Sequence, residues 1–321
     1  MNDGYAELVH GISRRYGLSV DDVEQRVANR CARCSGWLTR SGAARMVAAQ
    51  SRLEYVLGVR HVAGLELSDA VAAAVAESQR GNLTTLGYWP QPHESASSIG
   101  SRYVRAIDAI VESALDSSIS IKLDRLAFDR EALLQVFDHA KSRGVRVHFD
   151  AESLPSTDQV LAFVEEGLDL GVVVSMTLPS RWERSPTDAE RLIALGVPFR
   201  IVKGQGRDPH KPGIDPRRSF VDLVKQVAGR AAHVAVATHD RRVAEASLDL
   251  LLAANTPCSL EQLRFLPRLD TIAGRRGVPV RVYVPYGRPG LPYTLTQVTR
   301  RPAILLWALR DLARAALRGC T

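Results

Sequence analysis

Several short apolar segments of the sequence contain or end in charged and hydrogen-bonding side chains. Lys122 and Asp150 each end such a segment, while Arg200 and Tyr283 lie inside two others. Burying a lysine or an aspartate is costly unless an opposite charge lies beside it, so we expect these residues to meet. An ion pair flanked by a guanidinium and a phenol could bind and orient a polar ligand. The pairs Lys122–Asp150 and Arg200–Glu261 could also serve only to hold the fold together.

The elements that must position these residues alternate regularly after residue 81. Strand-like segments are separated by amphipathic helical segments, several of which end at a glycine. Because parallel strands need crossover helices, eight such repeats indicate an α/β fold, a (βα)8 TIM-type barrel. No GxGxxG motif follows the first strand, which disfavours a Rossmann fold. We expect an N-terminal helical segment at 1–80 and the barrel at 81–321.

The expected strands are 82–89, 118–123, 145–150, 171–178, 198–203, 233–239, 259–265 and 278–286. The expected helices between them are 94–115, 130–143, 156–166, 187–195, 218–227, 243–254 and 266–275, with a last helix at 291–317. In a barrel of this kind, polar residues near the carboxyl ends of strands belong to the active-site face. The candidate residues therefore converge at one rim.

Composition excludes several classes of protein. The 321 residues carry 42 Lys and Arg against 35 Asp and Glu, a net charge of +7. This charge reflects an arginine-rich proteome or a field that attracts an anionic cofactor, substrate or acidic partner. The arginines are scattered and no nucleic-acid-binding motif occurs, so nucleic acid is not an expected partner. No apolar run is long enough for a transmembrane segment and no secretory signal begins the chain, so we expect a cytoplasmic protein.

The four cysteines do not form a disulfide framework, which also fits a reducing compartment. Cys31 and Cys34 form a CxxC motif, but the sequence nearby supplies no second pair of zinc ligands. We therefore interpret them as thiols packed between helices and expect no metal site. Walker A, HExxH and GxSxG motifs do not occur in the sequence.

Residues 45–315 resemble the proline dehydrogenase family, the FAD-dependent barrel enzymes that also occur within proline utilization proteins. The motif Arg-Val-Tyr-Val-Pro-Tyr-Gly at 281–287 is the strongest match. Its alternating valines also identify a strand by themselves. The other matching motifs are Ser-Ile-Lys-Leu at 120–123, Phe-Asp-Ala-Glu at 149–152, Arg-Ile-Val-Lys-Gly at 200–204, Ala-Thr-His-Asp at 237–240, Gln-Leu at 262–263 and Arg-Pro-Ala at 301–303.

The resemblance implies a role for each matched residue. Lys122 and Asp150 would form an ion pair over the substrate, and Tyr283 would pack against the substrate, as would Tyr293 from the final helix. The residues expected to contact the flavin are Arg200, Val202, Lys203, Gly204, Thr238, His239, Ser175 and Gln262. Arginine, lysine and backbone N–H groups suit a diphosphate, and the flavin itself carries out the hydride chemistry.

The final helix departs from the family pattern. Two arginines that grip the proline carboxylate in the family are replaced by Thr296 and Gln297, which we assign to substrate binding. Losing two arginine–carboxylate contacts should cost roughly 3 kcal/mol or more with an amino acid substrate. Ser175 stands where the family has a glutamine, and the turn at 204–206 reads Gly-Gln-Gly.

Three hypotheses follow from this departure. We favour a flavoenzyme that oxidises the C–N bond of a proline-like amine, or of a prolyl ester, amide or carrier-protein thioester, to an imine. An ordinary proline dehydrogenase with unusual anchoring is the second hypothesis. The alternative is a barrel that has lost flavin redox chemistry and acts as a binding protein or non-redox enzyme. The expected partners are a small-molecule amine and either an acidic carrier protein or a quinone-type electron acceptor.

Overall fold

The structure of the chain is a computed structural model that describes residues 3–16, 20–33, 39–59, 62–91, 94–204 and 206–287. These residues divide between two compact units. One unit comprises Glu66–Tyr88 and Ser95–Tyr286, and the other contains the residues before Glu66. The division of the chain at residue 80 stays a prediction. The expected final helix at 291–317 lies outside the described residues.

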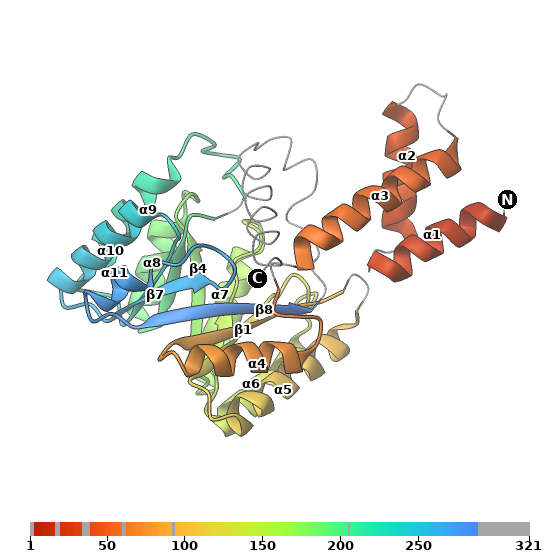
Figure 1. Ribbon diagram of the computed structural model, residues 1–321. Helices are drawn as coiled ribbons and strands as arrows, with labels where there is room; N and C mark the ends of the chain where they lie inside the picture. Colours follow the sequence, from red (N-terminus) through yellow and green to blue (C-terminus); the bar gives the residue numbers. More distant parts are fainter. Residues whose placement is uncertain are drawn as a thin grey trace, which may run out of the picture. The chain divides into compact units, whose positions relative to one another are not determined.

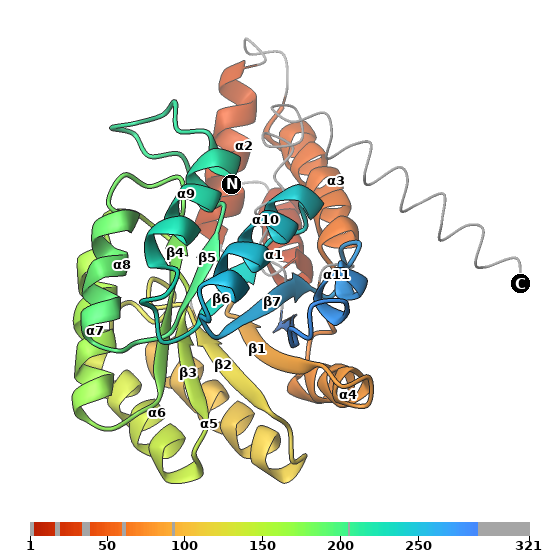
Figure 2. The same ribbon diagram turned by 90° about the vertical axis from the view of Figure 1, so that its left-hand side faces the viewer.

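The larger unit is a closed barrel of eight parallel strands in the order β1 to β8, as the sequence predicts. Figure 2 shows helices α5 to α10 on the outside of the strands. The strands are β1 Leu83–Trp89, β2 Ser117–Ile121, β3 Arg146–Phe149, β4 Val174–Pro179, β5 Phe199–Val202, β6 Val234–Ala237, β7 Cys258–Leu263 and β8 Val280–Gly287. The helices are α4 Leu67–Ser78, α5 Ala96–Glu112, α6 Arg130–Arg143, α7 Thr157–Asp169, α8 Ser185–Ala194, α9 Pro216–Val227, α10 Arg241–Ala253 and α11 Asp270–Gly274.

Local sequence signals place the ends of these helices. The Asp129 carboxylate accepts a hydrogen bond of 3.0 Å from the Ala132 N–H and caps the start of α6. Gly144 ends α6 in the left-handed conformation with φ of 68°, which a residue without a Cβ adopts at little cost. Asp215 caps α9 in the same way, accepting from the Arg217 N–H at 2.8 Å. These two helices thus begin and end where local signals place them, and each leads into the following strand.

The two faces of each strand differ sharply in polarity. Along β2, Ile119 and Ile121 are fully buried on the outer face of the barrel, beneath the helices. Ser118 and Lys122 lie on the opposite face, which is the barrel interior, since side chains alternate along a strand. The same alternation occurs in β3, where Val147 is apolar and buried. The barrel therefore has an apolar outer face beneath its helices and a largely polar interior.

The N-terminal unit is helical, and its helices are α1 Asp3–Tyr16, α2 Val20–Arg33 and α3 Arg40–Val59, drawn in red and orange in Figure 1. Val9, Ile12, Val23, Val27 and Val47 are members of its buried apolar cluster. Cys31, from α2, packs against this cluster, whereas Cys34 lies outside the described residues. None of the helices in the described ranges is long and apolar enough to cross a membrane.

Candidate active site

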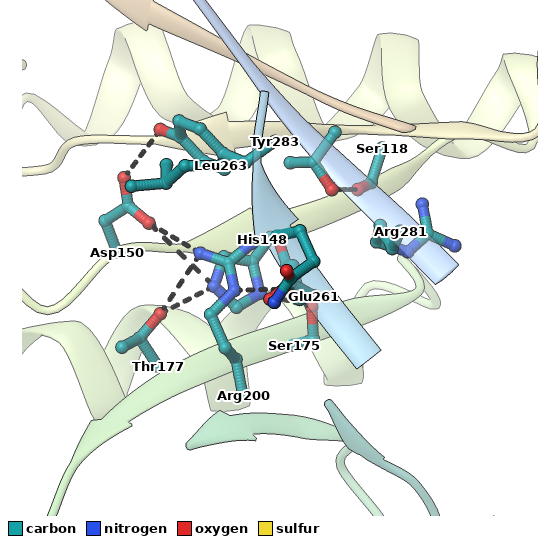
Figure 3. A network of polar contacts seen from close by, with 12 residues as sticks. Ser118, His148, Asp150, Ser175, Thr177, Arg200, Glu261, Leu263, Arg281 and Tyr283 are labelled. Carbon is teal, nitrogen blue, oxygen red and sulfur yellow. Dashed lines mark hydrogen bonds and ion pairs between the residues drawn. The ribbon is translucent and has the colours of Figure 1, made fainter. Parts of the chain in front are cut away.

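Asp150 is the centre of a group of charged side chains at the carboxyl ends of the barrel strands. Its Oδ2 accepts hydrogen bonds from Lys122 Nζ and from the Tyr283 hydroxyl, the latter at 3.2 Å. Its Oδ1 accepts from Arg200 Nη1 at 3.0 Å. Three strands that are far apart in the sequence, β2, β5 and β8, thus bring donors to one carboxylate that follows β3. We call these residues, together with Glu261, the carboxylate network. Figure 3 shows the contacts of Arg200 and Tyr283 with Asp150.

Glu261 on β7 supplies the second anion of the network. Arg200 donates from Nε to Glu261 Oε2 at 2.7 Å and from Nη2 to Oε1 at 2.5 Å. This two-bond geometry is the strong form of an arginine–carboxylate contact. The Arg200 guanidinium also lies 5.3 Å from the centre of the Tyr283 ring. Both ion pairs that the sequence predicts are therefore present, and Arg200 joins them into one network.

The network fixes the charge of its members at neutral pH. Burial opposes ionisation of Asp150, but Lys122 and Arg200 outweigh it and hold the pKa of the carboxyl well below its usual range. Burial likewise opposes the charge on Lys122, yet Asp150 raises the pKa of the ammonium well above its usual value. Burial and Asp150 raise the pKa of Tyr283. Asp150 is thus ionised, Lys122 protonated and Tyr283 neutral.

His148 on β3 lies beside the network, with its Nε2 3.9 Å from Asp150 Oδ1. Its Nδ1 lies 2.8 Å from Ser175 Oγ, and its Nε2 lies 2.7 Å from Thr177 Oγ1. Burial and the nearby Arg200 lower the pKa of His148 well below its usual value, so the ring is neutral. Ser175, which the sequence assigns to the flavin, therefore contacts a histidine inside the barrel.

Gly87 explains how Tyr283 reaches Asp150. A Cβ at position 87 would lie 2.2 Å from the Tyr283 hydroxyl oxygen. Only a residue without a side chain allows the phenol to lie across β1 at this point. This close approach was not recognised in the sequence, although an isolated glycine inside a strand is the signal for one.

Lys203, Gly204 and Thr238 lie together where β5 and β6 end. Lys203 Nζ is 3.0 Å from Asp240 Oδ2, and the same oxygen accepts from Arg217 Nε at 2.7 Å. Despite partial burial, these cations lower the pKa of Asp240 to about 2. The Asp240 N–H donates to Thr238 Oγ1 at 3.1 Å. Two cations contact one carboxylate, so the region where β5 and β6 end carries a net positive charge.

Gly204 follows β5 directly after Val202 and Lys203. Its φ is 79°, and a Cβ there would lie 2.7 Å from the Cβ of Pro179. Both features require glycine at this position. The chain can therefore turn tightly against the end of β4 immediately after Lys203.

Two residues assigned to the flavin have their polar atoms occupied by the backbone. His239 Nδ1 lies 2.9 Å from the Pro267 carbonyl oxygen, and Nε2 accepts from the Leu263 N–H at 3.0 Å. Gln262 donates to the Thr238 carbonyl at 2.5 Å and accepts from the Leu269 N–H at 2.9 Å. Both side chains hold the loop after β7 in place, which leaves the ring face of His239 as its contact surface.

Leu263 is a further candidate that the sequence reasoning missed. It ends β7 two residues after Glu261 and therefore shares its face of the strand. Its side chain is 40% exposed, although the residue is large and apolar. Leu263 is paired with Tyr283 in the register of β7 and β8, and both are labelled in Figure 3. The predicted substrate-binding residues Tyr293, Thr296 and Gln297 lie outside the described residues.

Comparisons with individual known proteins agree with the family resemblance of the sequence motifs, although no protein-family model matches the chain. Proline dehydrogenase 1 of Bacillus subtilis subsp. natto is 27% identical over 278 residues, which cover 79% of this chain and 90% of that protein. The proline dehydrogenase of Deinococcus radiodurans is 25% identical over 268 residues, which cover 77% and 86%.

Solved structures share the fold. Proline utilization A from Bdellovibrio bacteriovorus, inactivated by N-propargylglycine, matches with a TM-score of 0.62 and 15% identity over 77% of this chain and 32% of that one. The homologous protein from Corynebacterium freiburgense matches with a TM-score of 0.57 and 15% identity, over 94% and 34%. This chain spans about a third of the length of these two proteins. The curated relatives and the barrel together confirm that this chain resembles the proline dehydrogenase family.

Proposed function

We propose that this chain is an FAD-dependent oxidoreductase that oxidises a C–N bond of a proline-like amine to an imine. The observation that carries the proposal is the convergence of Lys122, Arg200 and Tyr283 on the Asp150 carboxylate. These four residues lie on the strands where the resemblance to proline dehydrogenases expects them. The similarity to two proteins named proline dehydrogenase supports the same reaction class.

The residues at the carboxyl ends of β5 to β7 fit a flavin. Leu263 exposes an apolar side chain beside the network, as a planar ring system would require. Lys203 and Arg217 place positive charge near the end of β5, where the turn at Gly204 keeps the backbone free of a side chain. Lys203, Gly204, Thr238, Val202, Arg200 and the ring face of His239 would hold the cofactor. Ser175 and Gln262 would act indirectly, through His148 and the loop after β7.

The charges of the network suit an amine substrate. Oxidation of an amine to an imine removes a hydride from carbon and a proton from nitrogen, and a bound flavin would supply the hydride acceptor. The ionised Asp150 would pair with the amine and orient it. Lys122 stays protonated, so it serves as a cation that fixes Asp150 and not as a base. Tyr283 donates to Asp150 and presents its ring as a wall of the site.

The substrate is, in our proposal, a proline derivative whose carboxylate is masked. Thr296 and Gln297 stand where two arginines would bind a free carboxylate, and an amide or hydroxyl suits a neutral ester, amide or thioester better. The net charge of +7 fits an acidic carrier protein as the source of a thioester. A quinone-type acceptor for the electrons and a cytoplasmic location stay predictions.

The first test is the flavin content of the purified protein. We expect a yellow protein that releases FAD on denaturation. Under anaerobic conditions, proline methyl ester and prolinamide should bleach the flavin at lower concentration than free proline. Bleaching by free proline at the lowest concentration would contradict the masked substrate while leaving the reaction class intact. A colourless protein that takes up no added FAD would instead support a barrel that has lost redox chemistry.

Lys122→Met separates a catalytic role from a structural one. We expect flavin reduction to slow by roughly 100-fold or more, because the cation beside Asp150 is lost. Arg200 still partners Asp150, so folding should survive. Lys225→Met is the matched control, since Lys225 is exposed on α9. Loss of folded protein without a change in the rate of the remaining fraction would assign Lys122 to the fold alone.

A further inference from the structure

The barrel interior contains a second open space, at the amino-terminal ends of the strands. This cavity has a volume of about 220 Å³, far more than the roughly 15 Å³ that a single water needs. Barrel interiors are ordinarily filled by layers of side chains. We call this space the N-terminal cavity. The residues of its wall used below are Ser118, Arg146, His233, Ser259, Glu261 and Arg281.

The interior is open here because several of the residues facing it are small. Thr85, Ser118, Ala235 and Ser259 occupy inward positions on β1, β2, β6 and β7. Thr85 and Ser118 are hydrogen-bonded to each other at 2.9 Å. None of these side chains spans the barrel. Apolar side chains such as Val173 and Pro198 also contribute to the wall, so the groups that could hold a polar occupant are the charged and hydroxyl side chains among them.

The charges on the wall are predominantly positive. The cavity is lined by three arginines, Arg146, Arg200 and Arg281, but by one carboxylate, Glu261. Glu261 is already neutralised by its two hydrogen bonds from Arg200. Arg146 and Arg281 therefore carry the charge that is available at the cavity. Figure 3 shows Arg281 on the opposite side of His148 from Asp150, and Arg281 is paired with Glu261 in the register of β7 and β8.

Asp116 offsets this charge only in part. Its Oδ1 accepts from Arg146 Nη2 and lies 3.8 Å from Arg281 Nη2, so one carboxylate serves two guanidinium groups. Asp116 is 58% exposed, which weakens its attraction through solvent screening. Arg281 is only 13% exposed and also donates to the Thr84 carbonyl at 2.5 Å. Five N–H donors per guanidinium leave both arginines able to bind a further acceptor.

Ser259 gives an independent sign of an occupant. It is 1% exposed and lies on the cavity wall. Its hydroxyl has no hydrogen-bond partner among the residues that the structure describes. A buried polar atom without a partner is destabilising, and one that faces a cavity is ordinarily satisfied by a ligand or water.

We propose that the N-terminal cavity binds a compact oxyanion with the charge of phosphate, held by Arg146, Arg281 and the Ser259 hydroxyl. A doubly charged anion matches the two guanidinium groups that share one exposed carboxylate. The site is separate from the mouth of the barrel and does not depend on the function proposed above. Burial, Arg281 and Arg146 also lower the pKa of His233 to about 4, as expected beside an excess of positive charge.

Calorimetric titration with inorganic phosphate tests this proposal. The wild-type protein should bind phosphate at one site. Arg146→Gln should weaken the affinity about tenfold or more, because a charge-assisted hydrogen bond is lost. Ser259→Ala should weaken it a few-fold, since a neutral bond contributes less. Arg143→Gln, a nearby exposed arginine that pairs with Asp108, and Lys203→Gln at the barrel mouth should bind as the wild type does.

Several results would overturn the proposal. These are a wild-type protein that binds no phosphate at millimolar concentration, an Arg146→Gln variant with unchanged affinity, and binding that Lys203→Gln abolishes. Circular dichroism will show whether each variant is folded. If Arg146→Gln does not fold, Ser259→Ala decides, because it removes one oxygen from a site that otherwise stays intact. Unchanged phosphate affinity in a folded Ser259→Ala protein would then reject the site.

Discussion

The two ends of the barrel interior use similar residues but match their charges differently. At the carboxyl end, Asp150 and Glu261 balance Lys122 and Arg200 through direct hydrogen bonds. At the amino end, Arg146 and Arg281 share Asp116, which is largely exposed. A matched network holds its members rigidly, whereas an unmatched cavity retains affinity for a ligand. The comparison indicates that the carboxyl end is organised for orientation and the amino end for capture of an anion.

Removing one carboxylate from each end is the strongest way to test this difference. Glu261→Gln should lower the free energy of unfolding by about 3–5 kcal/mol, because the buried Arg200 loses the negative charge of its two-bond partner. Asp116→Asn should cost no more than about 1 kcal/mol, since the pair is exposed. Denaturant titration of both variants gives the two values. Equal losses would mean that the two ends do not differ in this way.

Gly87→Ala tests how tightly the carboxylate network is packed. The new methyl group would collide with the Tyr283 hydroxyl, so the phenol must move away from Asp150. Overpacking of this kind costs about 1–3 kcal/mol of stability. The rate of flavin reduction should fall at least as far as in Tyr283→Phe, which removes the hydroxyl without crowding.

Gly274→Ala is the matched control for this substitution, because open space surrounds position 274 in α11. It should leave the rate of reduction unchanged and the stability equal to or slightly above that of the wild type. A Gly87→Ala protein with wild-type stability and rate would show that Tyr283 can shift without consequence.

The pH dependence of stability should reveal the buried neutral histidine. The folded-state pKa of His148 is lowered by burial and Arg200, so between about pH 6.5 and the folded pKa the unfolded chain binds more protons. Stability therefore falls as the pH decreases below about 6.5. Melting temperatures from about pH 7.5 to 4.5 measure this window before most carboxyl groups titrate.

His148→Gln should make the decline shallower, because one proton is no longer taken up on unfolding. The pKa of His233, lowered to about 4, adds a second contribution in the same direction from the amino end. His233→Gln should therefore reduce the slope as well. If neither variant changes the slope, the barrel interior does not keep these histidines neutral.

Much of the fold could be predicted because its signals are local. Asp129 and Gly144 mark the two ends of α6, and the alternation of serines with isoleucines in β2 identifies a strand with one polar face. The two ion pairs followed from the cost of burying single charges. The flavin contacts expected of Ser175, His239 and Gln262 were less predictable, since hydrogen bonds to His148, Leu263 and Leu269 occupy their polar atoms.

The sequence by itself determined the order of the strands and helices and which side chains share a strand face. Both properties depend on residues that are near one another in the chain. Only closure of the barrel decided that the polar faces turn inward, that Arg200 joins Asp150 to Glu261, and that Tyr283 lies over Gly87. These contacts join residues 50 or more positions apart. Distances across a closed sheet depend on strand register, which no local pattern specifies.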